Sequence, residues 1–358
     1  MDKLLIFTTD FEPLASGVAR YYFNLVSASQ HSNILQNVGI SFEVVAVDKK
    51  YSWWLYPKWL PYFWRLKKLI NQSDIKYIGV GQILPLGLPL LYLAKKFHKK
   101  IIIFTHGLDV ANLSGRRKSL AQYIFSHSNL IICNSEFTQN IINLKFKIYN
   151  LKFLTLTPCP AQLPEPESDF RLTPPDQPYI FSYGRLVARK GFVDLALALK
   201  TLWQKGEKFY WFLAGSGPEL ENIKKALGDY HDNLIYIGKV SDQMISNYLF
   251  RCAFFAMTPR NDPKDPEGFG MVYLEAGSLG RAVLGTRAGG IPEAVKDGQT
   301  GLLAEAGNIS DIADKTLKML KNPELCAELG KKGQNMVKTE YSWSNRAKLL
   351  SEALTRLY

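Results

Sequence analysis

Short runs of apolar and β-branched residues recur along the whole chain, and longer amphipathic segments separate most of them. Each run ends in small or polar residues such as Gly, Ser, Thr, Asn or Asp. Buried parallel strands are continuous apolar runs, and crossover helices supply the spacing between them. The pattern therefore predicts ten parallel strands, at residues 3–9, 42–47, 76–81, 100–107, 129–135, 179–185, 209–217, 233–240, 252–259 and 281–290.

Prolines concentrate in residues 158–178, which carry seven of the chain's 18 prolines together with acidic residues. Such proline density breaks helices and central strands, so it suits a linker. We therefore expect two doubly wound α/β domains, residues 1–160 and 179–340, joined by the linker 161–178. Ligands of open α/β sheets bind beyond the carboxyl ends of the strands, so a cleft between the two domains is the expected active site.

The composition is that of a chain able to bury a full core. Hydrophobic residues make up 47% of its 358 residues and charged residues 21%, a balance that excludes a disordered chain. The formal net charge is +12, and its excess lies almost entirely in one half. Residues 1–160 hold 19 basic and 8 acidic residues, whereas residues 161–358 hold 25 and 24. The first half is therefore basic and the second nearly neutral.

Cysteines and apolar segments bear on the cell compartment. Cys133, Cys159, Cys252 and Cys326 lie far apart without a CxxC or Cys/His cluster, which argues against a disulfide framework or structural zinc and fits a reducing cytosol. The apolar run at the N-terminus is too short for a signal peptide. Residues 77–94 carry no charge, but their prolines and glycine divide them into a short strand and a helix. We therefore expect a cytoplasmic, soluble chain.

Two glutamates stand eight residues apart around a glycine-flanked helix start. Glu267 precedes Gly268 and Gly270, and Glu275 follows on the expected helix. The glycines let backbone amides approach a ligand, and the first helical turn leaves N–H groups free for an anion. Carboxylates placed in this way can accept hydrogen bonds from sugar and ribose hydroxyls; the plainer alternative is a pair of solvated helix charges. A second glycine-rich turn at 288–293 favours the binding site.

A basic loop follows the first strand of the second half, in the segment GRLVARKG (184–191). Arg185 and Lys190 fall near one strand-to-helix turn, where Arg can hold a diphosphate by a two-pronged contact and Lys as a point charge. The alternative is an ordinary basic loop. Gly215 opens a further glycine turn after a strand, for which a structural role is the simpler interpretation.

In the first half, His106 ends a strongly apolar strand, and Gly17 opens the helical pattern after the first strand. A histidine at a strand end serves a structural role as often as a chemical one. The glycine marks a place where the backbone can approach a ligand. Neither residue is decisive alone.

Together these features resemble the retaining nucleotide-sugar glycosyltransferases of family 4, which have the GT-B fold. The resemblance covers nearly the whole chain and is most specific at Glu267 and Glu275, which are similar to that family's E-x7-E motif, and at GRLVARKG. It implies two Rossmann-like domains facing each other across a cleft, with a C-terminal helix, 341–358, crossing back to the N-terminal domain. The chain departs from the family pattern in the linker, TPCPAQL (157–163), and in the first loop, ASG (15–17).

The resemblance also implies a role for each candidate residue. Arg185 and Lys190 would bind the donor diphosphate, and Glu275 would bind the ribose. Glu267 would hold the donor sugar, and His106 would contact it near the reacting carbon, so that the catalytic set is His106, Glu267, Arg185 and Lys190. The remaining residues are Gly17, Phe269, Gly270 and Met271 at the diphosphate, Gly268 and Phe269 at the sugar, and Lys239, Val240 and Gly215 at the ribose and base.

By this resemblance we expect a hexosyltransferase that moves a sugar, with retention, from a nucleotide diphosphate sugar to a saccharide or lipid-linked acceptor in cell-surface polysaccharide or glycolipid synthesis. No DxD motif occurs, so we expect neither metal nor cofactor, with fixed cations offsetting the leaving charge. Donor frequency in the family favours a UDP-sugar such as UDP-glucose, with GDP-mannose as the alternative. A sugar-nucleotide epimerase of the same fold and a non-catalytic membrane- or nucleic-acid-binding protein stay open.

The most unusual segment is 49–70, which holds six Lys or Arg, eight aromatic residues and no acid. Aromatic rings and snorkelling lysines suit the headgroup region of an anionic membrane. Packing alone and stacking on single-stranded nucleic acid are the alternatives, and of these we do not expect nucleic acid. We predict a peripheral protein on the cytoplasmic face of the membrane. The candidates for this surface are Trp53, Trp54, Lys58, Trp59, Trp64, Arg65, Lys67 and Lys68, extended by the basic residues of 95–100 and 116–118.

Overall fold

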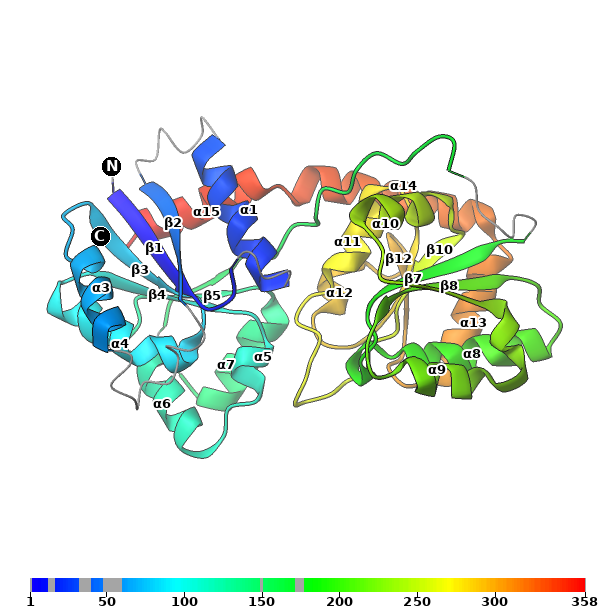
Figure 1. The fold of residues 1–358 in the computed structure, drawn as a ribbon, viewed down its shortest axis with the longest axis horizontal. Coiled ribbons are helices and arrows are strands. Elements are labelled where there is room, and N and C mark those ends of the chain that lie inside the picture. The colour runs from blue at the N-terminus through cyan, green and yellow to red at the C-terminus, as the bar shows by residue number, and fades with distance from the viewer. Residues whose placement is uncertain are drawn as a thin grey trace. The chain divides into compact units, whose positions relative to one another are not determined.

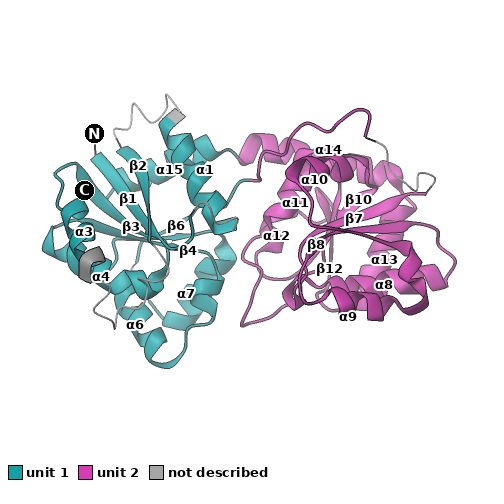
Figure 2. Ribbon diagram, viewed as in Figure 1, with its two compact units in different colours: residues 1–159, 342–358 teal, residues 160–341 magenta. Residues whose placement is uncertain are grey.

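The computed structural model describes residues 2–11, 17–31, 40–47, 60–148, 151–170 and 177–357. The chain divides into two compact units, residues 1–159 with 342–358 and residues 160–341, here called unit 1 and unit 2 (Figure 2). Each unit is built around a parallel sheet on which helices pack (Figure 1). The C-terminal helix therefore belongs to the same unit as the N-terminus.

Unit 1 contains a six-stranded parallel sheet in the order β2-β1-β3-β4-β5-β6. Its strands are β1 (Asp2–Thr8), β2 (Ile40–Ala46), β3 (Ile75–Val80), β4 (Lys100–Thr105), β5 (Leu130–Cys133) and β6 (Phe153–Thr155). Its helices are α1 (Gly17–His31), α3 (Leu60–Ile70), α4 (Ile83–Lys96), α5 (Leu108–Ala111), α6 (Gly115–Ser126), α7 (Glu136–Phe146) and α15 (Trp343–Thr355).

The sheet of unit 1 is apolar on both faces. Along β1, Leu5 and Phe7 belong to one buried cluster, whereas Leu4 and Ile6 belong to another, because successive side chains of a strand point to opposite faces. Side chains of α3, α4, α6 and α7 complete the first cluster, and those of α1 and α15 complete the second. A strand covered on both sides has no polar face, and this explains the unbroken apolar runs in the sequence.

Unit 2 contains a second six-stranded parallel sheet in the order β12-β11-β10-β7-β8-β9. Figure 1 shows α8, α9 and α13 on one side of this sheet and α10, α11 and α14 on the other. The strands are β7 (Tyr179–Arg185), β8 (Tyr210–Ser216), β9 (Leu234–Gly238), β10 (Phe254–Ala256), β11 (Val283–Thr286) and β12 (Gly301–Ala304). The α-helices are α8 (Phe192–Gln204), α9 (Leu220–Leu227), α10 (Asp242–Arg251), α11 (Met271–Ser278), α12 (Ile291–Ala294), α13 (Ile309–Leu320) and α14 (Pro323–Glu340), and the 3-10 helices are η3 (Ala188–Lys190) and η4 (Gly228–Asn233).

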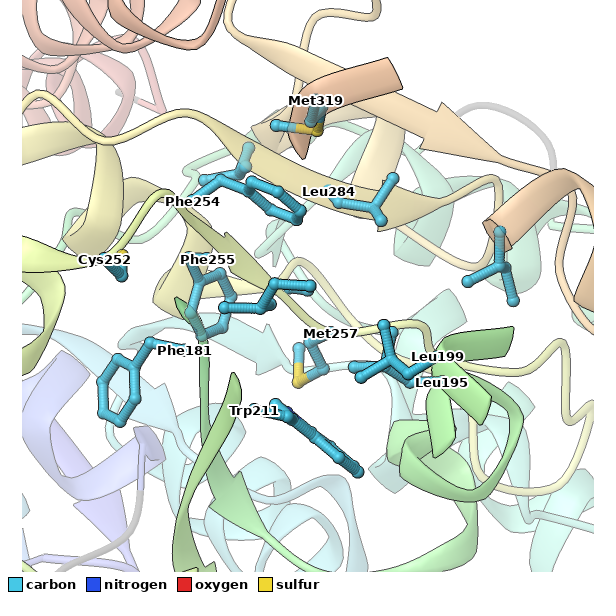
Figure 3. Close-up of a cluster of buried hydrophobic side chains, with 14 of the residues drawn as sticks. Phe181, Leu195, Leu199, Trp211, Cys252, Phe254, Phe255, Met257, Leu284 and Met319 are labelled. Atoms are coloured by element: carbon cyan, nitrogen blue, oxygen red, sulfur yellow. The ribbon is translucent and has the colours of Figure 1, made fainter. Parts of the chain in front are cut away.

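The core of unit 2 is one large cluster of aromatic and aliphatic side chains, in which Leu195 and Leu199 of α8 lie beside Trp211 of β8 (Figure 3). A chain of hydrogen bonds runs through this core. The Trp211 indole Nε1–H donates to the Ser182 hydroxyl at 2.9 Å, and that hydroxyl donates to the Ala256 carbonyl at 2.6 Å. These bonds join β8, β7 and β10. Breaking one would leave a buried polar group unpaired, which costs about 1–3 kcal/mol.

The predicted α/β class and its two parallel sheets are confirmed. All ten predicted strands are present, but the sequence pattern missed β6 and β12, which have three and four residues and lie at sheet edges. The uncharged residues 77–94 form most of β3 and α4, as predicted. No helix within the described ranges is long and apolar enough to cross a membrane. The four cysteines are buried and form no disulfide.

Candidate functional site

The carboxyl ends of β7 and β10 lie side by side where the strand order of unit 2 reverses. From β7 the chain adds β8 and β9 on one side, and it then returns to add β10, β11 and β12 on the other. Open α/β sheets bind ligands at such a switch point, because the loops leave it in opposite directions. The loop after β7 carries residues 186–191, directly after Arg185, and the loop after β10 carries residues 257–270. Both segments that the sequence singled out therefore meet here.

The loop after β7 packs directly against the loop after β10. Gly191 has a φ of 69°, and a Cβ atom there would lie 1.7 Å from the carbonyl oxygen of Thr258. The Thr258 hydroxyl donates to the Gly191 carbonyl at 2.8 Å. Only glycine combines this left-handed backbone with so close an approach. The last glycine of GRLVARKG therefore fixes Arg189 and Lys190 beside the second loop.

Four charged side chains from these two loops form what we call the ion cluster: Arg189, Lys190, Asp265 and Glu267. Lys190 Nζ lies 2.8 Å from Glu267 Oε2, and the Arg189 guanidinium pairs with the same oxygen. Arg189 Nε lies 3.2 Å from Asp265 Oδ1. The Lys190 and Glu267 side chains are each 11% exposed. Because burying an unpaired charge is costly, the balance of two cations and two carboxylates makes the cluster tolerable.

The charge state of Glu267 follows from this arrangement. Burial by itself would raise the pKa of Glu267, but the adjacent Lys190 and Arg189 cations outweigh burial and hold that pKa below its usual value. Arg185 adds a smaller contribution of the same sign. The carboxylate is therefore ionised at neutral pH and can act only as a hydrogen-bond acceptor.

Arg185 is an exposed cation at the start of this loop. It is the last residue of β7, its side chain is exposed, and it forms no ion pair with any residue that the structure describes. Its two basic neighbours, Arg189 and Lys190, are by contrast already paired with carboxylates. Of the three cations, Arg185 is therefore the one most open to an anionic ligand.

The second glycine-rich turn, before α12, supports Glu267 from the backbone side. The Gly290 N–H donates to the Glu267 carbonyl at 3.0 Å, and a Cβ atom at Gly289 would lie 2.1 Å from that oxygen. Gly268 packs in the same way, because a Cβ atom at Gly290 would lie 2.2 Å from its carbonyl oxygen. The glycines are therefore required for this close packing, and a function for them in ligand binding stays a prediction.

The helix α11 begins between the two glutamates. Gly270 precedes it with a φ of 92°, and Met271 is its first residue. The Phe269 ring is buried in a small apolar cluster with Leu274. Glu275, further along α11, is buried too.

Glu275 is tied to β7 by a hydrogen bond. The Tyr183 hydroxyl donates to Glu275 Oε2. Tyr183 lies two residues before Arg185, so one strand positions both the partner of Glu275 and the exposed cation. No local pattern indicated this pair, since the two residues are 92 positions apart.

The remaining predicted residues of unit 2 lie at the carboxyl ends of β8 and β9. Lys239 and Val240 directly follow β9, and the Lys239 side chain is exposed. Gly215, in β8, has a φ of 126°, and a Cβ atom there would lie 1.9 Å from the Gly184 carbonyl oxygen. Close packing of β8 on β7 accounts for this glycine, as the simpler interpretation proposed.

Arg189 and Asp265 are the charged residues of the cluster that the sequence analysis missed. Arg189 stands next to Lys190 in the motif, but adjacent residues in an extended loop point apart, and only the tight turn η3 brings both to Glu267. Asp265 lies in a polar loop rich in proline. Its position two residues before Glu267 was the available signal.

A separate pair holds the loop after β10 to α8. Arg260 donates through Nε to Asp194 Oδ2 at 2.6 Å, and its Nη2 contacts the other carboxylate oxygen. The Asp194 side chain is buried in the first turn of α8.

Within the described part of the chain, no three His, Cys, Asp or Glu side chains gather in a way that could hold a metal ion.

In unit 1, His106 follows β4 and is held by two tyrosines of α1. Its Nε2 lies 2.8 Å from the Tyr22 hydroxyl oxygen. The rings of Tyr21 and Tyr22 contact the imidazole edge-on, at centroid distances of 5.3 and 5.4 Å. Burial lowers the pKa of His106 to about 4. The imidazole is therefore neutral at physiological pH, with one nitrogen donating and the other accepting.

The turn that follows His106 is braced from several sides. Asp109 Oδ1 accepts a hydrogen bond from the His106 N–H at 2.9 Å, and the Asn134 side-chain amide donates to the His106 carbonyl at 3.3 Å. Lys145 donates to the Val110 carbonyl at 3.1 Å. Burial raises the pKa of Asp109 to about 6, against several backbone hydrogen bonds that lower it. These contacts fix the backbone that carries the imidazole.

Gln82 joins the loops that follow β1 and β3. The Thr9 N–H donates to Gln82 Oε1 at 2.8 Å, and Gln82 Nε2 donates to the Thr8 hydroxyl at 2.9 Å. These strands flank the point at which the strand order of unit 1 reverses. Gly17 is the first residue of α1, and the loop before it, residues 12–16, lies outside the described ranges.

The basic aromatic segment is described only from residue 60 onward, so Trp53, Trp54, Lys58 and Trp59 lie outside the described residues. On α3, the Trp64 side chain is 56% exposed, and Lys67 Nζ lies 4.6 Å from its ring centroid. Arg65 and Lys68 are exposed as well. The end of this segment thus presents an exposed ring surrounded by cations.

Neighbouring helices extend this surface. Helix α4 packs against both α3 and α6, and it carries the exposed Tyr92, while α6 carries the exposed Tyr123. Lys95 Nζ lies 5.7 Å from the Tyr123 ring centroid. Lys99, which was expected to belong to this face, instead donates to the Gln72 and Ile75 carbonyls. Its ammonium group therefore joins the residue before β4 to the backbone at the start of β3.

Comparison with known proteins agrees with this architecture. The sequence model of the glycosyl transferases group 1 matches residues 165–336, and that of Glycosyltransferase Family 4 matches residues 17–152. A solved structure, sucrose-phosphate synthase from Thermosynechococcus elongatus, superimposes with a TM-score of 0.79 at 18% identity, covering 100% of this chain and 99% of that chain. The fold is the GT-B fold of glycosyltransferases. Within that class, the chain belongs to glycosyltransferase family 4.

Two curated relatives carry more specific names. A GDP-mannose-dependent alpha-(1-6)-phosphatidylinositol monomannoside mannosyltransferase of Mycobacterium tuberculosis is 27% identical over 305 residues, 81% of this chain and 78% of the relative. A GDP-mannose-dependent monoacylated alpha-(1-6)-phosphatidylinositol monomannoside mannosyltransferase of Corynebacterium glutamicum is 26% identical over 379 aligned positions, 99% of this chain and 97% of the relative.

Proposed function

We propose that this glycosyltransferase moves a hexose, with retention and without a metal ion, from a nucleotide diphosphate sugar bound at the switch point of unit 2. The observation that carries the proposal is the gathering of Arg185, Lys190, Glu267 and Glu275 at the carboxyl ends of β7 and β10. It supplies cations for a diphosphate and carboxylates for hydroxyl groups, which are the two kinds of group that such a donor presents.

The proposed chemistry follows from the charges that develop. Breaking the bond between the anomeric carbon and oxygen builds negative charge on the leaving diphosphate. Arg185 and Lys190, with the amides that begin α11, would stabilise that charge, and fixed cations would take the place of a metal. Glu267 would accept hydrogen bonds from the sugar and Glu275 from the ribose, while Lys239 and Val240 would frame the base. The neutral His106 would contact the sugar near the reacting carbon.

For the stereochemistry we propose attack by the acceptor from the face that the diphosphate leaves. Retention otherwise requires a nucleophilic carboxylate on the far face of the sugar. Glu267 is paired with two cations, which makes its carboxylate a weak nucleophile. Burial raises the pKa of Asp109 to about 6, and its backbone hydrogen bonds hold it in the turn. Neither carboxylate is arranged as a nucleophile.

We propose GDP-mannose as the donor, in place of the UDP-sugar that family frequency favoured. The support is that both relatives named above are called GDP-mannose-dependent mannosyltransferases and align over 81% and 99% of this chain. Their names also describe phosphatidylinositol mannosides as acceptors, which favours a lipid-linked acceptor here.

A calorimetric titration of the full chain with GDP, UDP and ADP, free of metal, tests the donor. We expect micromolar binding of GDP that is lost in Glu275→Ala, because that variant removes the ribose acceptor. Binding of UDP alone would restore the UDP-sugar prediction. Absence of binding by all three would refute the proposed function. Product analysis with GDP-mannose then separates transfer, which needs an acceptor, from epimerisation, which does not.

We also propose that unit 1 docks on the anionic, cytoplasmic face of a membrane through α3, α4 and α6. The support is the exposed Trp64, Tyr92 and Tyr123 with their neighbouring cations. Such binding combines burial of rings at the headgroups with Coulomb attraction. Co-sedimentation with vesicles that contain phosphatidylserine should weaken as salt is raised. No binding at low salt would remove this part of the proposal.

A further inference from the structure

The ion cluster places one carboxylate on the cations that a diphosphate would need. Glu267 Oε2 lies 2.8 Å from Lys190 Nζ and also pairs with Arg189. Both partners of the Lys190 pair are almost fully buried. A diphosphate arriving at Lys190 therefore meets an ammonium group whose charge Glu267 already neutralises.

We propose that Glu267 is an internal competitor for the diphosphate on Lys190, and that Arg189 is a positioning residue that keeps hold of Glu267 when Lys190 changes partner. The inference rests on the proposed function, since it assumes that Lys190 binds the leaving diphosphate. While no donor is bound, the Glu267 carboxylate is paired with the Lys190 ammonium group. When the donor binds, its phosphate oxygens take the place of that carboxylate at Lys190. Glu267 is thereby released toward the sugar at the moment the donor arrives.

Arg189 is suited to the positioning role by its two carboxylate partners. Its Nε lies 3.2 Å from Asp265 Oδ1, and its terminal nitrogen contacts Glu267. The contact with Asp265 is an ion pair without a hydrogen bond, since Arg189 Nε has no hydrogen-bond partner among the described residues. It still gives the planar guanidinium a second carboxylate while its terminal nitrogen holds Glu267. The arginine side chain is 9% exposed, which leaves it little room to turn toward solvent.

Competition gives a prediction of unusual sign: removal of a carboxylate from the donor site should strengthen nucleoside diphosphate binding. Glu267→Gln keeps the shape of the side chain and removes its charge. We expect this variant to bind GDP about tenfold more tightly than the unaltered chain, because one charge-assisted contact no longer has to be broken. Transfer from GDP-mannose should fall in the same variant, since the amide is a poorer acceptor for sugar hydroxyls.

The experiment is a calorimetric titration of the full chain with GDP, and with guanosine as a ligand that lacks phosphate. Guanosine affinity should not change in Glu267→Gln, since no phosphate competes. Arg189→Gln should bind GDP more weakly than the unaltered chain, because Glu267 then rests on Lys190 alone. In the double variant, Arg189→Gln should have less effect than it has alone, which a purely structural role would not produce.

Three results decide the matter. Tighter GDP binding by Glu267→Gln with unchanged guanosine binding supports the competition. Equal or weaker GDP binding by a Glu267→Gln protein whose circular dichroism matches the unaltered chain overturns the competition and leaves the proposed function standing. Failure of the unaltered chain to bind GDP, UDP or ADP overturns the proposed function, and this inference falls with it.

Discussion

Both units gather polar side chains at the carboxyl ends of their strands, but the two gatherings differ in charge. In unit 2, Lys190 and Glu267 are buried as an ion pair beside Arg189. In unit 1, the groups around His106 are a neutral imidazole and the Tyr22 hydroxyl, and the nearby Asp109 has a pKa raised by burial to about 6. The charged groups of unit 2 are therefore suited to stabilise charge on a ligand, whereas His106 and Tyr22 of unit 1 offer hydrogen bonds from uncharged side chains.

The contrast runs against the net charge of the two halves. Residues 1–160 carry the basic excess, 19 basic against 8 acidic residues, and residues 161–358 are nearly balanced. The ionic site nevertheless lies in the balanced half, because its cations are paired with carboxylates. In the first half, by contrast, cations such as Arg65 and Lys68 lie exposed on α3. The net charge of each half therefore indicates how basic its surface is, whereas the candidate binding site is found at the buried ion pairs of Glu267.

The largest effect is expected from Arg185→Ala. If the unit 2 edge stabilises a leaving diphosphate, this variant should lower kcat/KM for GDP-mannose by about 100- to 1,000-fold. Its melting temperature should hardly change, because the exposed Arg185 pairs with no described residue. The measurements are GDP release and thermal unfolding, with the exposed Arg356→Ala as the control. Near-normal turnover in Arg185→Ala would end the assignment of Arg185 to the diphosphate.

The second test uses the opposite pKa shifts of His106 and Asp109 in unit 1. Burial lowers the pKa of His106 from 6.5 to about 4, so its contribution to stability is present above pH 6.5 and is lost as pH falls toward 4. Burial raises the pKa of Asp109 from 3.8 to about 6, so its contribution is present below pH 3.8 and is lost as pH rises through 6. Each shift corresponds to about 3 kcal/mol, and the two oppose each other between pH 4 and 6.

Single substitutions should uncover each contribution. In Asp109→Asn only the contribution of His106 to stability remains, so the free energy of unfolding should fall as pH drops from 6.5 to 4. In His106→Gln only the contribution of the Asp109 carboxyl remains, so the free energy of unfolding should rise as pH drops from 6.5 to 4. Thermal unfolding of the full chain between pH 4 and 7 measures both. Two variants with the same pH dependence would contradict the opposite pKa shifts of His106 and Asp109.

A smaller effect should separate the two cores. Ser182→Ala leaves both the Trp211 indole N–H and the Ala256 carbonyl without their partner, and we expect it to destabilise unit 2 by about 1–3 kcal/mol. Thr105→Val in unit 1 removes a hydroxyl that donates to the Ile132 carbonyl at 3.0 Å, and about 1 kcal/mol is expected. Urea unfolding compares them. GDP affinity should be unchanged in Ser182→Ala, and a larger cost for Thr105→Val would reverse the ranking.

The smallest effect is expected on the exposed basic surface. Lys67→Ala and Lys68→Ala should each weaken binding to anionic vesicles roughly fivefold, since a basic residue near such a surface contributes about 1 kcal/mol. Trp64→Ala should weaken it further by removing an exposed ring. Phe250→Ala, which alters an exposed ring of unit 2, serves as the control. Equal losses in Phe250→Ala and Trp64→Ala would show that unit 1 has no special role.

Much of the fold could be read from local pattern. Ten of the twelve described strands could be predicted because a strand buried on both faces is an unbroken apolar run, as Leu4 to Phe7 illustrate. The edge strands β6 and β12 escaped notice although β5, β10 and β11 are as short, so their length alone does not explain the miss. Glycines such as Gly191 signalled tight turns, but not that a neighbouring carbonyl would lie where a Cβ atom would be.

The order of residues alone predicts the class of fold, the place of the basic aromatic segment, and the two segments that supply the candidate site. These follow from periodicity and composition, which are local properties. The partners of these residues follow from the three-dimensional arrangement. Lys190 and Arg189 share the carboxylate of Glu267, Tyr183 holds Glu275, and Tyr22 holds His106. Such pairs join segments far apart in the chain. Those of Glu267 and Glu275 form because the strand order brings β10 beside β7. Sheet topology is a global property, so no local pattern encodes it.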